Sequence, residues 1–183
     1  MRRPEWKALC WPLLRATPKE RTAWFAKVLV GALIVILGAA YVADNWRLLW
    51  DRQVRKCMDV NVLLFHTKPQ DSYRRGDILV FESRNAEPVF PNGMRLAKVA
   101  AGVPGDVVEI TSNERILVNG VEVARGLPYL DKIEPQKRSK FYGRRTLGED
   151  EYWMMGTTER SFDSRYWGSI HAGQILGKAW VLF

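Results

Sequence analysis

The stretch "RILVNGVEV", Arg115 to Val123, carries the clearest fold signal in this chain. Two short runs rich in aliphatic and β-branched residues are joined by Asn119-Gly120. An Asn-Gly pair readily adopts the two positive φ angles of a tight type I′ turn, whose twist matches that of paired strands. The stretch therefore predicts an antiparallel β-hairpin.

Short apolar runs on either side of this hairpin have the same character. They are "GDILVF" at 76–81, "YWMMG" at 152–156 and the terminal "KAWVLF" at 178–183. Each is short, apolar and close to a glycine or a turn, which is typical of strands, and no long amphipathic helical pattern accompanies them. The Lys- and Arg-rich stretch 126–148 is predicted to be a loop-rich insertion. We expect a mainly β domain over residues 57–183.

A long apolar run precedes this domain. Sixteen residues, Val28 to Ala43, carry no charge, and adding Trp24 to Lys27 gives about twenty, which spans a hydrocarbon core of about 30 Å at 1.5 Å per residue. We predict a transmembrane anchor at 24–43, after a basic segment at 1–23 and before an interfacial linker at 44–56. The alternatives are a cleaved signal peptide and a helix buried in a soluble core. A long charged leader disfavours the first, and the lack of a polar face disfavours the second.

Charge is distributed unevenly about this run. Seven Lys or Arg residues precede it, whereas Asp44 and Asp51 partly offset the cations that follow. The positive-inside rule then predicts a cytoplasmic N-terminus and an external domain. The net charge of +8 includes a second basic group at 132–145 with no nucleic-acid motif around it. We therefore expect the lipid bilayer, and no nucleic acid, among the partners.

The chain has two cysteines, Cys10 and Cys57. The predicted topology puts them on opposite sides of the membrane, so they cannot pair within one chain. Most free cysteines are small buried hydrophobes, which is the simpler interpretation of Cys57. The adjacent Arg55 and Lys56 instead favour a thiolate, and with it a nucleophile. The residues around Cys57 leave both interpretations open.

One lysine stands in an apolar setting. In "RLAKVAAGVPGD", Lys98 lies among small and apolar residues, shortly before a turn rich in Pro and Gly at 102–106. Burial lowers the affinity of an amine for its proton, so such a lysine can act as a general base near neutral pH. The alternative is an edge lysine that points into water.

Polar residues alternate in "SFDSR" near the C-terminus. If this piece is extended, Ser161, Asp163 and Arg165 share one face. A hydroxyl, a carboxylate and a guanidinium that converge can fix one another and orient a lysine. On the surface, the same three residues would form an ion pair of little consequence.

Two of these stretches resemble sequence boxes of the bacterial type I signal peptidases. "KVAAGVPGD" is similar to their lysine box, and "GTTERSFDSRYWG" is similar to their C-terminal box. The resemblance covers the chain from about Cys57 to Phe183. It implies a β-rich periplasmic catalytic domain on one N-terminal anchor in the bacterial inner membrane, with no cofactor and no metal.

The same resemblance implies a role for each polar residue. Lys98 would be the general base of a dyad, Ser161 would hold its amine, and Asp163 with Arg165 would brace the site. The family has a further box, which contains its nucleophile, and there this chain departs from the pattern. Cys57-Met58-Asp59-Val60 stands where Ser-Met-x-Pro-Thr-Leu is usual. Cys57 thus occupies the position of the nucleophile.

Two further departures concern spacing and composition. Gly76 follows Cys57 by nineteen residues, which is similar to the TraF-type branch of conjugative peptidases. These enzymes mature pilin subunits, and some join the pilin ends into a ring. Thr157-Thr158-Glu159 replaces the usual Asp-Asn-Arg type of run.

These expectations combine into one hypothesis about function. The chain would be a membrane-anchored peptidase or transpeptidase that cleaves, and in one version cyclises, a membrane-inserted pilin precursor with a Cys57–Lys98 dyad. A general leader peptidase for secreted preproteins and an inactive assembly factor of the same fold are the alternatives.

Other chemistries remain as rivals. His66 or His171 could pair with Cys57, and Ser72 could be the nucleophile. Two histidines without a Cys-x-x-Cys pair disfavour a metal site. A redox role would need a second cysteine on the same side of the membrane.

Overall fold

The structure is a computed structural model that describes residues 17–50, 57–87, 89–132 and 135–183. The chain divides into two compact units, residues 1–44 and 45–183, which are described separately. Most of the predicted basic segment, Cys10 and part of the predicted linker lie outside the described residues.

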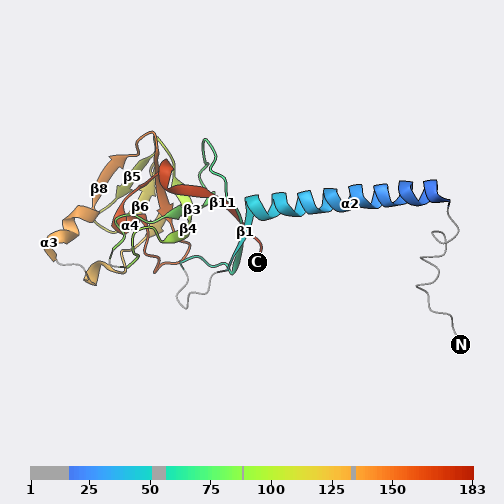
Figure 1. Ribbon diagram of the computed structural model, residues 1–183. Coiled ribbons are helices and arrows are strands. Elements are labelled where there is room, and N and C mark those ends of the chain that lie inside the picture. Colours follow the sequence, from blue (N-terminus) through green and yellow to red (C-terminus); the bar gives the residue numbers. More distant parts are fainter. Residues whose placement is uncertain (1–16, 51–56, 88, 133–134) are drawn as a thin grey trace, which may run out of the picture. The chain divides into compact units, whose positions relative to one another are not determined.

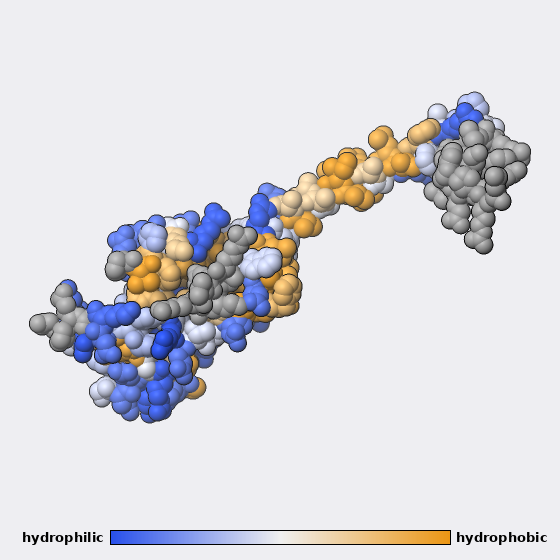
Figure 2. All heavy atoms as spheres, turned by 90° about the horizontal axis from the view of Figure 1, so that it is seen from below, coloured by the Kyte–Doolittle hydropathy of each residue, from blue (hydrophilic) through white to orange (hydrophobic). Residues whose placement is uncertain are grey.

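The first unit contains helix α2, Pro18–Asn45, which is long and apolar enough to cross a membrane. The helix begins at a capping box, in which the Thr17 N–H donates to the Glu20 carboxylate at 2.7 Å and the Thr17 hydroxyl accepts from the Glu20 N–H at 3.4 Å. Figure 2 shows apolar side chains along the length of α2. In the described residues no other helix is longer than four residues.

The second unit contains two antiparallel sheets (Figure 1). The larger has the strand order β1 (Trp46–Trp50), β2 (Val62–His66), β11 (Ile175–Val181), β3 (Ile78–Glu82), β4 (Arg95–Gly102), β9 (Glu151–Met155) and β10 (Ile170–His171). The smaller has the order β7 (Val121–Arg125), β6 (Arg115–Val118), β5 (Val107–Ile110) and β8 (Gly143–Thr146). The prediction of a mainly β domain with one N-terminal apolar helix is confirmed.

Short helical turns connect some of the strands. They are η1 (Leu130–Lys132), α3 (Pro135–Arg138), η2 (Ser139–Phe141), α4 (Ser164–Trp167) and η3 (Ala172–Gln174). Of these, α4 matters most for the site, because it follows directly on the predicted brace residue Asp163.

The predicted hairpin is present, and its turn has the expected backbone. Asn119 has a φ of 51° and Gly120 a φ of 81°, between β6 and β7. The three flanking apolar runs contribute to β3, β9 and β11. Local residue patterns therefore sufficed to predict these strands.

Two segments differ from what the sequence indicated. Residues 143–146, within the predicted loop-rich stretch, form β8 because they pair with β5. Residues 46–50, within the predicted linker, form β1 because all five pair with β2. Both strands depend on partners distant in the sequence, which a local pattern does not reveal.

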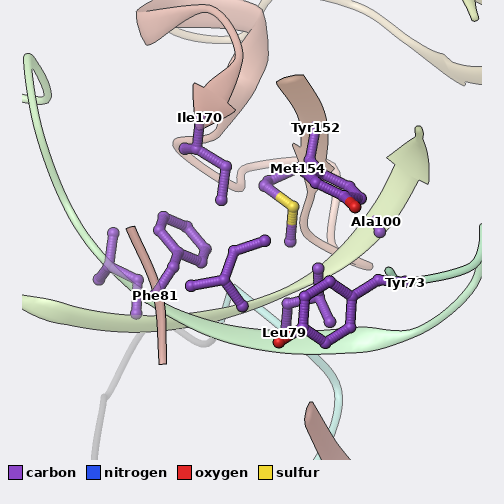
Figure 3. Close-up of a cluster of buried hydrophobic side chains, with 9 residues drawn as sticks. Tyr73, Leu79, Phe81, Ala100, Tyr152, Met154 and Ile170 are labelled. Atoms are coloured by element: carbon purple, nitrogen blue, oxygen red, sulfur yellow. The ribbon is translucent and has the colours of Figure 1, made fainter. Parts of the chain in front are cut away.

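The largest sheet packs its apolar side chains into a core that adjoins the site (Figure 3). Leu79, Phe81, Tyr152, Met154 and Ile170 are among its buried members. Burial alternates along β4, so that every second residue from Leu96 to Gly102 is buried. This alternation directs one lysine of β4 into the interior.

Candidate active site

Lys98 is that residue, and only 1% of it is exposed. Its register partner on β3 is the fully buried Leu79. The Nζ atom donates a hydrogen bond to the Ser161 hydroxyl at 2.9 Å and lies 5.7 Å from the centre of the Trp167 ring. The alternative of an edge lysine pointing into water is therefore wrong.

Burial lowers the pKa of the Lys98 amine below its ordinary value of 10.5, because the surrounding protein solvates an ammonium poorly. Charge interaction and hydrogen bonding with Cys57 act in the opposite direction, as does the Asp163 carboxylate. The Arg165 guanidinium lowers this pKa further. The lowered pKa brings the neutral amine, which can accept a proton, closer to physiological pH.

The other predicted polar residues form one buried network. Arg165 binds Asp163 through two hydrogen bonds, from Nε at 2.8 Å and from an Nη atom at 2.9 Å. The guanidinium also donates to the carbonyl oxygens of Ser161 at 2.9 Å and Gly126 at 3.0 Å. Because neither charged residue is more than 2% exposed, the surface ion-pair alternative is wrong.

The local backbone differs from the predicted extended stretch. Asp163 caps the short helix α4, accepting from the Arg165 N–H at 3.3 Å, so the chain turns between Asp163 and Arg165. The side chains of Asp163 and Arg165 nevertheless meet, because they bind each other across this turn. The Arg165 bond to the Ser161 carbonyl then ties the hydroxyl-bearing residue to the network.

Cys57 is partly buried and lines a cavity of about 210 Å³ together with Lys98. Most of the other lining side chains are apolar, and they include Leu49, Trp50, Met58, Val60, Leu63, Val80, Phe90, Leu96 and Ala97. The thiol and the amine are therefore neighbours, although 41 positions separate Cys57 from Lys98 in the sequence.

Gly156 allows the backbone at Cys57 and the side chain of Ser161 to approach each other closely. A Cβ atom at this position would overlap the Ser161 hydroxyl and the Cys57 carbonyl oxygen. The Gly156 N–H donates to the Asp163 carboxylate at 3.1 Å. Only glycine fits here without displacing one of these groups.

Sequence reasoning missed several contacts of the site. Thr157 binds the backbone on both sides of Met58, and Trp167 lies beside the Lys98 amine. In the sequence, Thr157 stood out only as part of the run Thr157-Thr158-Glu159, which differs from the usual C-terminal box. Because about a hundred residues separate it from Cys57, no local spacing signals the contact.

The rival residues occupy other places. The His66 ring packs against Trp46 at 4.9 Å between ring centres, and His171 Nδ1 lies 2.9 Å from the Asp150 carboxylate. Neither histidine lines the cavity of Cys57, nor does the exposed Ser72. Within residues 17–50, 57–87, 89–132 and 135–183, no group of three His, Cys, Asp or Glu residues could hold a metal ion.

The arrangement suits acyl transfer. A thiol and a buried amine line one cavity, and a hydroxyl with a buried ion pair fixes the amine. A base that can accept the nucleophile's proton and is itself oriented by a third group is the general requirement for forming a covalent acyl intermediate.

Comparison with known proteins agrees with this chemistry. Residues 21–183 match the family described as "Signal peptidase, peptidase S26". A probable signal peptidase I-2 of Synechocystis sp. is 28% identical over 177 residues, covering 92% of this chain and 77% of that protein. Signal peptidase I of Pseudomonas fluorescens is 29% identical over 143 residues, covering 60% of this chain and 49% of that protein.

A solved structure is also similar. A signal peptidase I from Enterococcus faecalis is 26% identical, with a TM-score of 0.37, over 62% of this chain and 98% of that chain.

The chain belongs to the signal peptidase family, peptidase S26. The predicted class, an endopeptidase of the signal peptidase I type, is thereby confirmed. Such peptidases act on preproteins at a membrane, and the apolar helix α2 agrees with a membrane-anchored protein. The identities of the nucleophile and the base stay predictions.

Proposed function

We propose that this protein is a membrane-anchored endopeptidase that removes leader peptides from preproteins with Cys57 as nucleophile and Lys98 as general base. The observation that carries the proposal is the buried Lys98 amine, which is bonded to Ser161 and interacts with the Cys57 thiol. Ser161 orients the amine, and the Asp163–Arg165 pair fixes Ser161 through its carbonyl.

The reaction proceeds in two acyl-transfer steps. Neutral Lys98 takes the thiol proton, and the Cys57 sulfur attacks the scissile carbonyl carbon to form a C–S bond. The C–N bond then breaks, and Lys98 returns its proton to the leaving amine. The leader remains on Cys57 as a thioester until water or an amine displaces the sulfur.

Backbone donors can stabilise the oxyanion of this reaction. In the described part of the chain, neither the Cys57 N–H nor the Met58 N–H has a hydrogen-bond acceptor. Donors beside the nucleophile that are not committed elsewhere are what an oxyanion site requires. We assign this role to one or both of these groups.

The edge of β4 offers a place for an extended substrate. Residues 95–98 pair with β3 on one side, whereas pairing with β9 begins only at Val99. A peptide segment could add to this edge as a further strand, with its side chains in the mainly apolar cavity. The scissile bond would then lie beside Lys98, at the end of the free edge.

The charge distribution and one face of the sheet support the proposed location. The distribution of Lys and Arg supports the bacterial inner membrane with a cytoplasmic N-terminus and a periplasmic domain. On β1 and β11, which share a sheet with β2, exposed apolar side chains gather on one face, among them Leu48 (68%) and Trp180 (39%). Since β1 directly follows α2 in the chain, we propose that this face meets the lipid surface.

A second candidate function is the maturation of a membrane-inserted pilin precursor, with cyclisation. A thiol nucleophile favours it, because thioesters react with amines more readily, relative to water, than oxygen esters do. The nineteen-residue spacing between Cys57 and Gly76, similar to the TraF-type branch, points the same way. In this version the cut lies near the C-terminal end of the pilin, the released C-terminal segment takes the proton on its new amine, and the pilin stays on Cys57 as a thioester through its new C-terminal carbonyl. The pilin's own N-terminal amine then displaces the sulfur and closes the ring.

Intact-mass analysis of processed substrate tests both candidates. Full-length protein in detergent is incubated with a leader-bearing preprotein or with a pilin precursor, and the Cys57→Ser and Cys57→Ala variants are run alongside. A linear product lacking its leader supports the first function, and a product lighter than the mature linear pilin by the mass of one water molecule supports cyclisation. Processing by Cys57→Ala at the unmodified rate would overturn the assignment of the nucleophile.

A further inference from the structure

The Cys57 segment has no regular secondary structure of its own. It forms a bend, and β2 begins only at Val62. A nucleophile must be held within a fraction of an ångström of its working geometry, so other parts of the molecule have to fix this loop.

Thr157 holds the loop on both sides of Met58. Its N–H donates to the Cys57 carbonyl oxygen at 3.0 Å, and its hydroxyl accepts from the Asp59 N–H at 2.8 Å. These bonds engage the two peptide groups that flank the Cα atom of Met58, a residue that is itself only 4% exposed. Thr158 adds a longer bond, 3.4 Å, from its N–H to the same carbonyl.

We propose that Thr157 is the positioning residue of the nucleophile, an assignment that rests on the proposed function of Cys57. The residue does not touch the reacting atoms. It fixes the backbone on which the thiol is mounted, and thereby the direction of the sulfur toward Lys98.

The same contact orients a candidate oxyanion donor. In a trans peptide the C=O and N–H bonds point in opposite directions. The bond from Thr157 to the Cys57 carbonyl therefore turns the Met58 N–H away from the Thr157 loop. That N–H has no acceptor in the part of the chain that is described.

A hydroxyl suits this position beside a thiol. It accepts the Asp59 N–H without adding a charge, whereas a carboxylate would place a negative charge near Cys57. Such a charge would disfavour a thiolate by like-charge repulsion. Threonine thus supplies the bond without placing a charge beside the nucleophile.

The test uses the full-length chain in detergent, in a Cys10→Ser background so that Cys57 is the sole thiol. Thr157→Val removes the hydroxyl acceptor and nearly preserves shape, whereas Thr157→Ser keeps the acceptor. Thr146→Val, at an exposed position of β8 in the smaller sheet, is the matched control. The measurements are kcat and KM for leader removal and the pH profile of Cys57 alkylation by iodoacetamide.

For Thr157→Val we expect kcat to fall about tenfold, as the loss of one hydrogen bond implies, with KM within about twofold. The alkylation profile should change as well, because a displaced sulfur no longer lies at a fixed place relative to the Lys98 amine. Thr157→Ser should restore both readouts, and Thr146→Val should change neither.

Three outcomes would overturn the assignment. Normal kcat and an unchanged profile in Thr157→Val, with Cys57→Ala inactive, would refute the role of Thr157 alone. Full processing by Cys57→Ala would remove the proposed function and this inference together. A Thr157→Val protein with an altered melting temperature but unchanged kcat and profile would show a structural role only, which also refutes it.

Discussion

The two halves of the candidate site are held in different ways. The half around the base is buried and charged: Lys98 comes from a central strand, and Asp163 with Arg165 fixes its partner Ser161. The half around the nucleophile is a bend whose carbonyl and N–H groups are held by neutral partners at 157–158.

This difference indicates which half of the site tolerates amino-acid substitutions. Removing one member of a buried ion pair leaves an uncompensated charge, so the base half tolerates little variation. A loop held by single neutral hydrogen bonds loses less when a contact changes. Most of the residues that depart from the family boxes, Cys57 to Val60 and Thr157-Thr158, lie in the second half.

The largest effect is expected from Lys98→Met, which replaces the amine with an apolar chain of similar length. Leader removal should slow by about 10²- to 10⁴-fold, the usual contribution of a general base. The variant should remain folded, because methionine suits the apolar neighbours of this position. Rates of product formation, with circular dichroism as the folding check, test this. Activity within tenfold of the unmodified protein would contradict it.

Arg165→Ala should destabilise the fold by about 3–5 kcal/mol, because it leaves the Asp163 carboxylate buried and unpaired. The free energy of unfolding is measured by chemical denaturation. Arg125→Ala is the control, since Arg125 is 67% exposed where it pairs with Glu122, and it should change stability little. If the two substitutions lowered the free energy of unfolding equally, the buried ion pair would not be what stabilises the half of the site around the base.

The lowered pKa of Lys98 predicts a pH dependence of stability. Between the folded pKa and about 10.5 the unfolded chain binds more protons than the folded chain, so the free energy of unfolding rises with pH across this window. The contribution of Lys98 is least favourable below the folded pKa, where the buried amine is charged. As the pH rises, the free energy of unfolding of the unmodified protein should therefore increase relative to that of Lys98→Met. A constant difference between the two would mean that the amine keeps its ordinary pKa.

A smaller effect is expected from Ser161→Ala, which removes the 2.9 Å acceptor of the Lys98 amine. We expect kcat to fall by about tenfold, near the net value of one buried hydrogen bond. Ser164→Ala is a useful comparison, because that buried hydroxyl accepts from the Met154 N–H and does not touch Lys98. If both variants lose activity equally, the effect of Ser161 is structural.

Local residue patterns predicted much of this molecule. The Asn119-Gly120 turn and the apolar helix follow from residues close in sequence, whereas the neighbours of Lys98 left both a buried and an exposed lysine open. The pairing of β1 with β2 and of β8 with β5 does not, because edge strands are defined by distant partners. The contact between Thr157 and Cys57 was equally invisible, since it joins two loops that only the folded sheets bring together.

The central claim, attack by the Cys57 sulfur assisted by the neutral Lys98 amine, is tested most directly by trapping the acyl-enzyme. Full-length protein is mixed with preprotein, quenched in acid within one turnover, and mapped by peptide mass spectrometry. The account predicts the leader joined through its C-terminal carbonyl to Cys57, released by hydroxylamine, and lacking in Lys98→Met. A leader adduct on any other residue, such as Ser72, would contradict it, as would rapid turnover in Cys57→Ala.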